Sequence, residues 1–124
     1  MKILMLSDVY FPRINGVSTS IKTFRDDLQQ LGHECTLVAP HYPVNAETPD
    51  DSGIVRIPSW QVPFDPEDRL LSWSKLKNWS ASLSPGSFDV IHVQTPFTAH
   101  YAGLRIAGKL GAPVIETYHT YFEH

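Results

Sequence analysis

Three polar segments of this chain combine residue types that bind polar ligands or take part in acid–base chemistry. They are residues 7–17, 94–96 and 116–124, and each of them follows an apolar run. In open parallel sheets, ligands bind beyond the carboxyl ends of the strands. If the apolar runs are such strands, the three segments meet at one edge of the sheet and form one site.

The first segment carries a glycine, Gly16, where a helix is expected to begin. Backbone N–H groups at a helix start approach an anion closely when no side chain intervenes, and the helix dipole adds to the attraction. A diphosphate suits this geometry, held by Gly16 with Asn15 and Val17. A plain turn and helix cap also explains the Asn15-Gly16 pair, and the residues alone leave both interpretations open. The Gly-x-Gly-x-x-Gly and P-loop signatures are absent, which disfavours nicotinamide enzymes and P-loop NTPases.

The third segment places His119 just after an expected strand. A histidine there can bond sugar hydroxyls or phosphate, or carry a proton near neutral pH. A ring satisfied by the neighbouring backbone is the alternative. A metal site made of His119, Glu123 and His124 is disfavoured, because their spacing matches neither a helical nor a strand face. We therefore expect no metal.

A sheet and helices must position these segments, and the apolar pattern predicts both. Continuous apolar runs predict buried strands at residues 3–6, 33–39, 54–57, 88–93 and 113–117. The periodicity predicts one helix over residues 17–31 with an apolar face formed by Val17, Ile21, Phe24, Leu28 and Leu31. A second helix is expected over residues 67–83, and a third is expected to be capped by Thr95 and to begin at Pro96. The alternation predicts an α/β fold: a Rossmann-like open parallel sheet with helices on both faces.

Composition narrows the class of protein further. The 124 residues suffice for one domain with a core. A formal net charge of -3 excludes the basic footprint of a nucleic-acid-binding protein. A single cysteine excludes an internal disulfide. No apolar stretch reaches the roughly 20 residues of a membrane span, so we expect a cytoplasmic location.

One part of the expected helix 67–83 combines tryptophan with lysine: Trp73, Lys75, Lys77 and Trp79. Aromatic and basic side chains together are typical of segments that lie at a membrane surface. The apolar residues do not keep to one face of this helix, so packing against the sheet or against a partner domain is the alternative. A peripheral contact with the inner face of the membrane stays a hypothesis at this stage.

Taken together, four segments resemble the N-terminal domain of the retaining GT-B glycosyltransferases of family 4. They are residues 1–17, 31–38, 89–96 and 117–124. Asn15 stands where the family usually has the first glycine of a pair. The last segment, with Tyr118-His119-Thr120 at its centre, is similar to the form found in enzymes that glycosylate lipids such as diacylglycerol.

The resemblance implies transfer of a sugar from a UDP- or GDP-sugar to a lipid or glycan acceptor, with retention of configuration and without a cofactor. It implies that His119 is catalytic and that the donor diphosphate lies at the loop of Asn15, Gly16 and Val17. The acceptor or cleft residues that it implies are Tyr10, Thr95, Tyr118, Thr120 and Glu123. It also implies a C-terminal donor-binding domain that these residues lack. We therefore expect residues 1–124 to be a truncated acceptor-side domain that is inactive alone.

The strand–helix alternation also fits a protein of a different class. A self-contained flavodoxin-like module would bind a small ligand or a partner without catalysis. The coding sequence downstream of His124 would discriminate between the two hypotheses. A further strand–helix domain containing a Glu-x7-Glu element would favour the glycosyltransferase, and a natural stop codon would favour the binding module.

Overall fold

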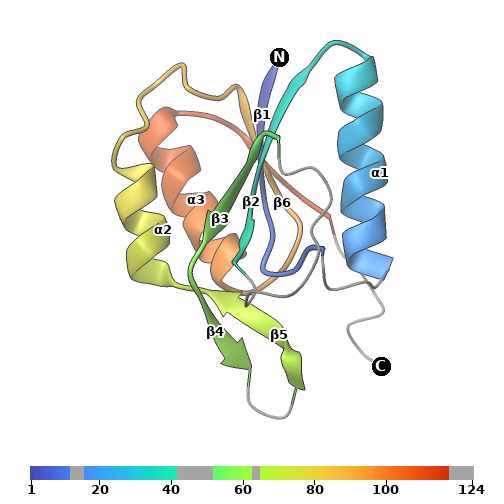
Figure 1. The fold of residues 1–124 in the computed structure, drawn as a ribbon. Helices are drawn as coiled ribbons and strands as arrows, with labels where there is room; N and C mark the ends of the chain where they lie inside the picture. Colours follow the sequence, from blue (N-terminus) through green and yellow to red (C-terminus); the bar gives the residue numbers. More distant parts are fainter. Residues whose placement is uncertain (12–15, 42–51, 63–64, 118–124) are drawn as a thin grey trace.

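The computed structural model describes residues 1–11, 16–41, 52–62 and 65–117. Its centre is a five-stranded sheet with the order β3-β2-β1-β6-β7 (Figure 1), in which every neighbouring pair is parallel. The strands are β1 (Lys2–Leu6), β2 (Glu34–Pro40), β3 (Ile54–Ile57), β6 (Val90–Val93) and β7 (Val114–Glu116). The apolar runs therefore form strands as predicted, and the α/β, Rossmann-like class is confirmed.

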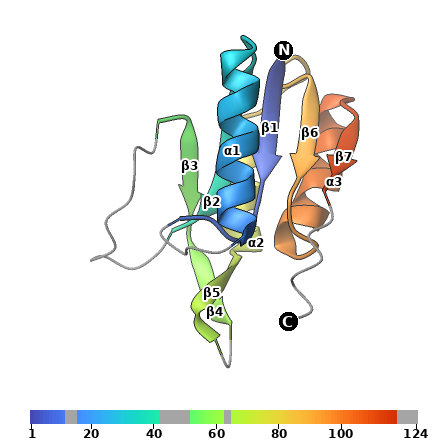
Figure 2. The ribbon, with the colours of Figure 1, turned by 90° about the vertical axis from the view of Figure 1, so that its right-hand side faces the viewer.

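Helices cover both faces of this sheet. Helix α1 (Gly16–Gln30) lies on one face, whereas α2 (Trp73–Ser80) and α3 (Thr98–Leu110) lie on the other (Figures 1 and 2). The core accordingly has two halves. Ile3, Met5 and Leu37 pack on the α1 side, and Leu4, Leu6 and Ile91 on the side of α2 and α3. Alternate residues of β1 thus serve both halves, as the pleat of a central strand requires.

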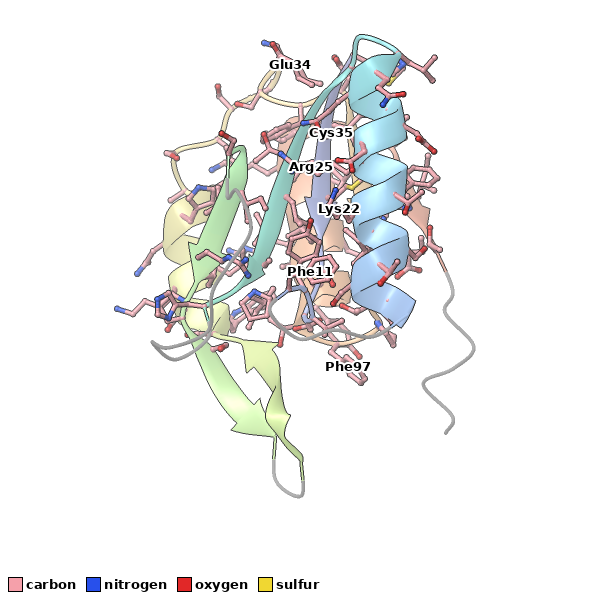
Figure 3. All side chains as sticks on the ribbon, turned by 45° about the vertical axis from the view of Figure 1, so that its right-hand side comes forward. Phe11, Lys22, Arg25, Glu34, Cys35 and Phe97 are labelled. Atoms are coloured by element: carbon pink, nitrogen blue, oxygen red, sulfur yellow. The ribbon has the colours of Figure 1, made fainter. Side chains whose placement is uncertain are left out.

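The apolar face predicted for the first helix is only partly correct. Val17 and Ile21 are buried, but Phe24 and Leu31 are exposed, and Arg25 is buried instead. Arg25 reaches from α1 to β2 beside Cys35 (Figure 3), where its Nε donates to the Cys35 carbonyl at 3.1 Å and its terminal nitrogen to the Ser52 carbonyl at 2.8 Å. These bonds let a guanidinium occupy a core position, because a buried charge is tolerated when its donors are satisfied.

The helix predicted over residues 67–83 was wrong in its first part. Residues 59–62 and 65–71 form an antiparallel hairpin, β4 (Ser59–Val62) and β5 (Asp65–Leu71), which projects beyond the carboxyl edge of the sheet (Figures 1 and 2). Helix α2 begins only at Trp73, because the Ser72 side chain accepts from the Lys75 backbone N–H and caps the helix there. No helix in the described part of the chain is long and apolar enough to cross a membrane.

Helix α3 approaches β6 closely at Gly103. A Cβ atom at this position would lie 2.4 Å from Val93 Cγ2, well inside van der Waals contact. Gly108 of the same helix faces open space. Gly103 is therefore required for the close contact between α3 and β6, whereas Gly108 only lowers the helix propensity of α3.

Gly103→Ala is expected to destabilise the fold by about 1–3 kcal/mol, because the added methyl group overpacks the α3–β6 contact. Gly108→Ala is the matched control and should stabilise it by up to about 1 kcal/mol, the difference in helix propensity. Urea unfolding followed by circular dichroism measures both variants. Equal effects of the two substitutions would contradict the close approach of α3 to β6.

Candidate functional site

The sheet reverses its connection order at β1, so the ends of β1 and β6 define a crevice. The chain leaves β1 through α1 to reach β2 on one side, while β6 pairs with β1 on the other. Ligands of open α/β sheets bind at this point, beyond the carboxyl ends of the strands. Two of the three polar segments, the one after β1 and the one after β6, meet here.

Asp8 joins these two segments directly. Its Oδ2 accepts from Thr95 Oγ1 at 2.7 Å and from the Ala99 backbone N–H at 3.0 Å, and its own backbone N–H donates to Thr95 Oγ1 at 2.8 Å. The other carboxyl oxygen, Oδ1, accepts from the Leu71 N–H at 3.1 Å. Burial raises the pKa of Asp8, and the bonds from Ala99, Thr95 and Leu71 act in the opposite direction. The effect of desolvation on the pKa of Asp8 is therefore larger than the opposite effect of the three hydrogen bonds, which stabilise the charged form.

The start of α3 differs from the sequence prediction as a consequence. Thr95 does not cap the helix, and Pro96 is not its first residue: α3 begins at Thr98, and Phe97 at the N-cap position makes no side-chain cap bond. The Asp8 carboxylate accepts from the second helical residue instead, so the cap comes from the end of another strand. Thr95 is buried, and its hydroxyl bonds to Asp8 rather than facing the crevice.

Asp8 was not among the site residues predicted from the sequence. The sequence around Asp8 does indicate a structural role for this residue. A lone carboxylate between a buried strand and apolar residues must find donors within the fold, since a buried charge without partners is costly. His92 was missed as well: it is buried in β6, and its Nε2 lies 2.6 Å from the hydroxyl of Thr117, where the third polar segment leaves β7.

Tyr10 is not placed for stacking on a ligand. It is only 3% exposed. Its ring packs edge-on against Phe11, with 5.2 Å between centroids, and Arg56 lies 5.6 Å from the ring centroid. Half-buried Phe11 and exposed Phe97 do reach the surface at this edge, and both are labelled in Figure 3.

The predicted diphosphate loop is described only in part. Gly16 is the exposed first residue of α1, and Val17 behind it is buried in the core. Val17 therefore contributes its backbone alone to any site at this helix start. The other predicted site residues lie outside the described residues: Asn15, Tyr118, His119, Thr120 and Glu123. Among the residues that are described, no cluster of three His, Cys, Asp or Glu side chains could hold a metal ion.

A shallow, open depression of about 670 Å³ lies beside the crevice, on the side of α2 and α3. Its lining is mainly aromatic: Trp73, Pro96, Phe97, Thr98 and Tyr101. We call it the aromatic pocket. Its two walls are the start of α2 and the start of α3.

The sequence matches the model of one protein family, described as Glycosyltransferase Family 4, over residues 14–124. That match covers most of the chain. The chain belongs to glycosyltransferase family 4. The resemblance seen in its motifs is thereby confirmed.

Several curated relatives of this family 4 chain are glycolipid or mannosyl transferases. An alpha-monoglucosyldiacylglycerol synthase of Streptococcus pneumoniae is 36% identical over 99% of the chain, and one of Acholeplasma laidlawii is 30% identical over 99%. A GDP-mannose-dependent alpha-mannosyltransferase of Mycobacterium tuberculosis is 27% identical over 97%. The chain spans only 27%, 31% and 32% of the lengths of these three relatives.

A solved structure with a different sequence has a similar fold. The C-terminal domain of a hydrogenase from Pyrococcus furiosus superposes with a TM-score of 0.57 at 13% identity, covering 94% of this chain and 90% of that one. At this level of identity the likeness shows the architecture alone. The α/β arrangement of the family 4 chain is therefore shared with proteins of other function.

Burial of Tyr10 gives the family 4 chain a pH dependence. Burial raises the pKa of its phenol, so the folded chain holds the proton more tightly than the unfolded chain does. This contribution to stability is complete below about pH 10, the ordinary tyrosine value, and is lost as the pH rises toward the folded value. We expect the free energy of unfolding to fall more steeply above pH 10 in the wild type than in Tyr10→Phe. Identical profiles would mean that Tyr10 is exposed.

Proposed function

We propose that this chain is the N-terminal, acceptor-side domain of a two-domain GT-B glycosyltransferase. The complete enzyme transfers a sugar from a nucleotide-sugar donor to a lipid or glycan acceptor, with retention of configuration. The observation that carries the proposal is the family match over residues 14–124, which includes the start of α1, strand β6 and the segment after β6. Two diacylglycerol-glycosylating relatives favour a membrane lipid as the acceptor. The mannosyltransferase relative makes a GDP-sugar a candidate donor beside a UDP-sugar.

The two helix starts at the crevice differ in what they can bind. The N-terminus of α3 already receives the carboxylate of Asp8, whereas α1 begins with exposed Gly16. In sugar transfer, negative charge grows on the leaving diphosphate, and preorganised N–H donors stabilise it. We place the diphosphate at the start of α1, where the helix dipole and a residue without a side chain favour an anion.

His119 is the proposed catalytic residue. It follows β7 by three residues, and Thr117, at the base of its segment, donates its backbone N–H to the Val93 carbonyl at 3.0 Å. Thr117, from which the segment continues, therefore lies beside the end of β6 at the crevice. A neutral imidazole there would hold the donor sugar by hydrogen bonds. No cofactor or metal is part of the proposal.

His119→Ala in the complete enzyme should lower kcat about a hundredfold, comparable to the loss of one preorganised donor. His33→Ala is the control, because His33 lies before β2 at the opposite edge of the sheet. Turnover is measured with UDP- and GDP-sugars against diacylglycerol and glycan acceptors. Near wild-type kcat in the His119 variant would remove it from the site, and no transfer by the wild type from any donor would contradict the proposed function.

We also propose that the surface of α2 and α3 contacts an anionic membrane on its cytoplasmic side. The two helices carry Lys75, Lys77, Arg105 and Lys109 but no carboxylate, although the chain as a whole is acidic. Lys77 and Arg105 line the groove between the helices. Exposed Trp73, Phe97 and Tyr101 lie close by. Aromatic rings and cations on one surface suit the headgroup region of a bilayer.

The double substitution Lys75→Glu and Lys77→Glu should weaken binding to anionic vesicles by about 2 kcal/mol, or about thirtyfold, since each surface cation contributes about 1 kcal/mol. Lys2→Glu with Lys22→Glu makes the same change of charge in β1 and α1 and should bind as the wild type does. Vesicle flotation of the complete enzyme measures both. Equal binding by all three proteins would contradict the proposed membrane contact.

A further inference from the structure

One buried carboxylate connects three corners of the carboxyl edge. Asp8 lies at the end of β1, Leu71 at the end of β5, and Ala99 in the first turn of α3. The hydrogen bonds to Leu71 and Ala99 span 63 and 91 positions of sequence. Asp8 itself is 2% exposed. Its place in the fold is therefore fixed by partners from two distant parts of the chain.

Each of these partners adjoins, in sequence, residues that line the aromatic pocket. Leu71 precedes Trp73 by two residues, with the helix cap Ser72 between them. Ala99 lies between Phe97 and Tyr101 on the opposite wall. The two oxygens of a single carboxyl group thus bond to backbone N–H groups next to the two walls, one oxygen on each side. Asp8 therefore connects the start of α3 to the residues that lead into α2.

The residues on either side of Asp8 are bonded to each other. Ser7 and Val9 are buried, and the Ser7 hydroxyl accepts from the Val9 N–H at 3.1 Å and donates to the Val9 carbonyl at 2.5 Å. These bonds hold the backbone on both sides of Asp8 in a compact turn, so a shift at Asp8 would also displace Ser7 and Val9.

We propose that Asp8 is a positioning residue for the acceptor: it holds the two walls of the aromatic pocket in register with the crevice where the sugar is transferred. The inference rests on the proposed function and deepens it, because it names the residue that couples the acceptor surface to the transfer site. Asp8 touches no substrate in this role. It acts through Leu71, Thr95 and Ala99, whose positions it sets.

The test uses the complete enzyme with three kinds of variant. Asp8→Asn keeps the size of the side chain but puts an NH₂ group against one of its donor partners. Thr95→Val removes the hydroxyl that bonds Asp8 and keeps the shape, while Thr95→Ser keeps the hydroxyl. Asp89→Asn is the matched control, because the Asp89 Oδ2 accepts from the Lys2 backbone N–H at 2.7 Å at the opposite end of β1.

We expect Asp8→Asn to raise KM for the acceptor about tenfold or more, with KM for the nucleotide sugar within twofold of the wild type, since misplacement by about 1 Å has effects of this order or larger. Thr95→Val should change acceptor KM in the same direction, and Thr95→Ser less. Asp89→Asn should behave as the wild type. A smaller folded fraction lowers the apparent kcat but leaves KM unchanged. A change in acceptor KM therefore distinguishes a positioning role of Asp8 from an effect on stability alone.

Wild-type acceptor KM in folded Asp8→Asn would overturn the inference, as would a loss of kcat that only follows the loss of folded protein. Hydrogen exchange gives a second measure that needs no turnover. The amides of Leu71 and Ala99 should exchange faster in Asp8→Asn than in Asp89→Asn, and equal rates would also overturn the inference. A wild type that transfers no sugar counts against the proposed function instead, and the exchange result still decides whether Asp8 holds the walls.

Discussion

The hydrogen bonds of the Asp8 carboxylate are the constraint on which the carboxyl edge depends. A charge buried to this degree costs free energy unless donors surround it, and here three donors come from the end of β5, the segment after β6 and the first turn of α3. Burial still raises its pKa. Burial of Asp8 therefore costs desolvation free energy. In exchange, its hydrogen bonds join the end of β1, the end of β5 and the start of α3 in a defined arrangement.

The Asp8 carboxylate bonds to the N-terminus of α3 but not to that of α1. A helix N-terminus attracts anions, and an α/β crevice usually offers more than one. In this chain Asp8 satisfies the start of α3, whereas α1 starts at exposed Gly16. An internal anion at the start of α3 leaves the start of α1 as the helix N-terminus available to a ligand anion. In the proposed enzyme, this arrangement would favour a donor whose diphosphate points toward α1 and an acceptor that arrives from the side of α3.

The sequence predicted the parts of this structure that depend on local pattern. Continuous apolar runs located all five parallel strands, because burial on both faces leaves a signal within each strand. The sequence predictions were wrong where a residue far away in the sequence determines the local structure. The start of α3 depends on a carboxylate 91 positions away, and the buried face of α1 depends on carbonyls of Cys35 and Ser52 that satisfy Arg25. Neither partner is visible in the local periodicity.

The candidate site was predictable to a similar extent. The edge, the glycine at the start of α1 and the segment after β7 follow from strand ends and turn residues. The roles of Tyr10 and Thr95 did not, because burial depends on neighbours such as Arg56 and Asp8. A polar residue after a strand has two possible functions: to face the ligand, or to hold the loops that do. Sequence alone does not separate them, since both need the same residue types.

The distribution of charge adds a constraint on how a lipid acceptor reaches the site. The cations of α2 and α3 lie on one side of the sheet, and the proposed diphosphate site at the start of α1 lies on the other. These two regions meet only along the carboxyl edge, where the aromatic pocket opens. A headgroup drawn from a membrane against α2 and α3 must therefore cross this edge to meet the donor. The hydrogen bonds of Asp8 lie at this edge, so in the proposed enzyme the residue that joins β1, β5 and α3 would also govern the geometry of the crossing.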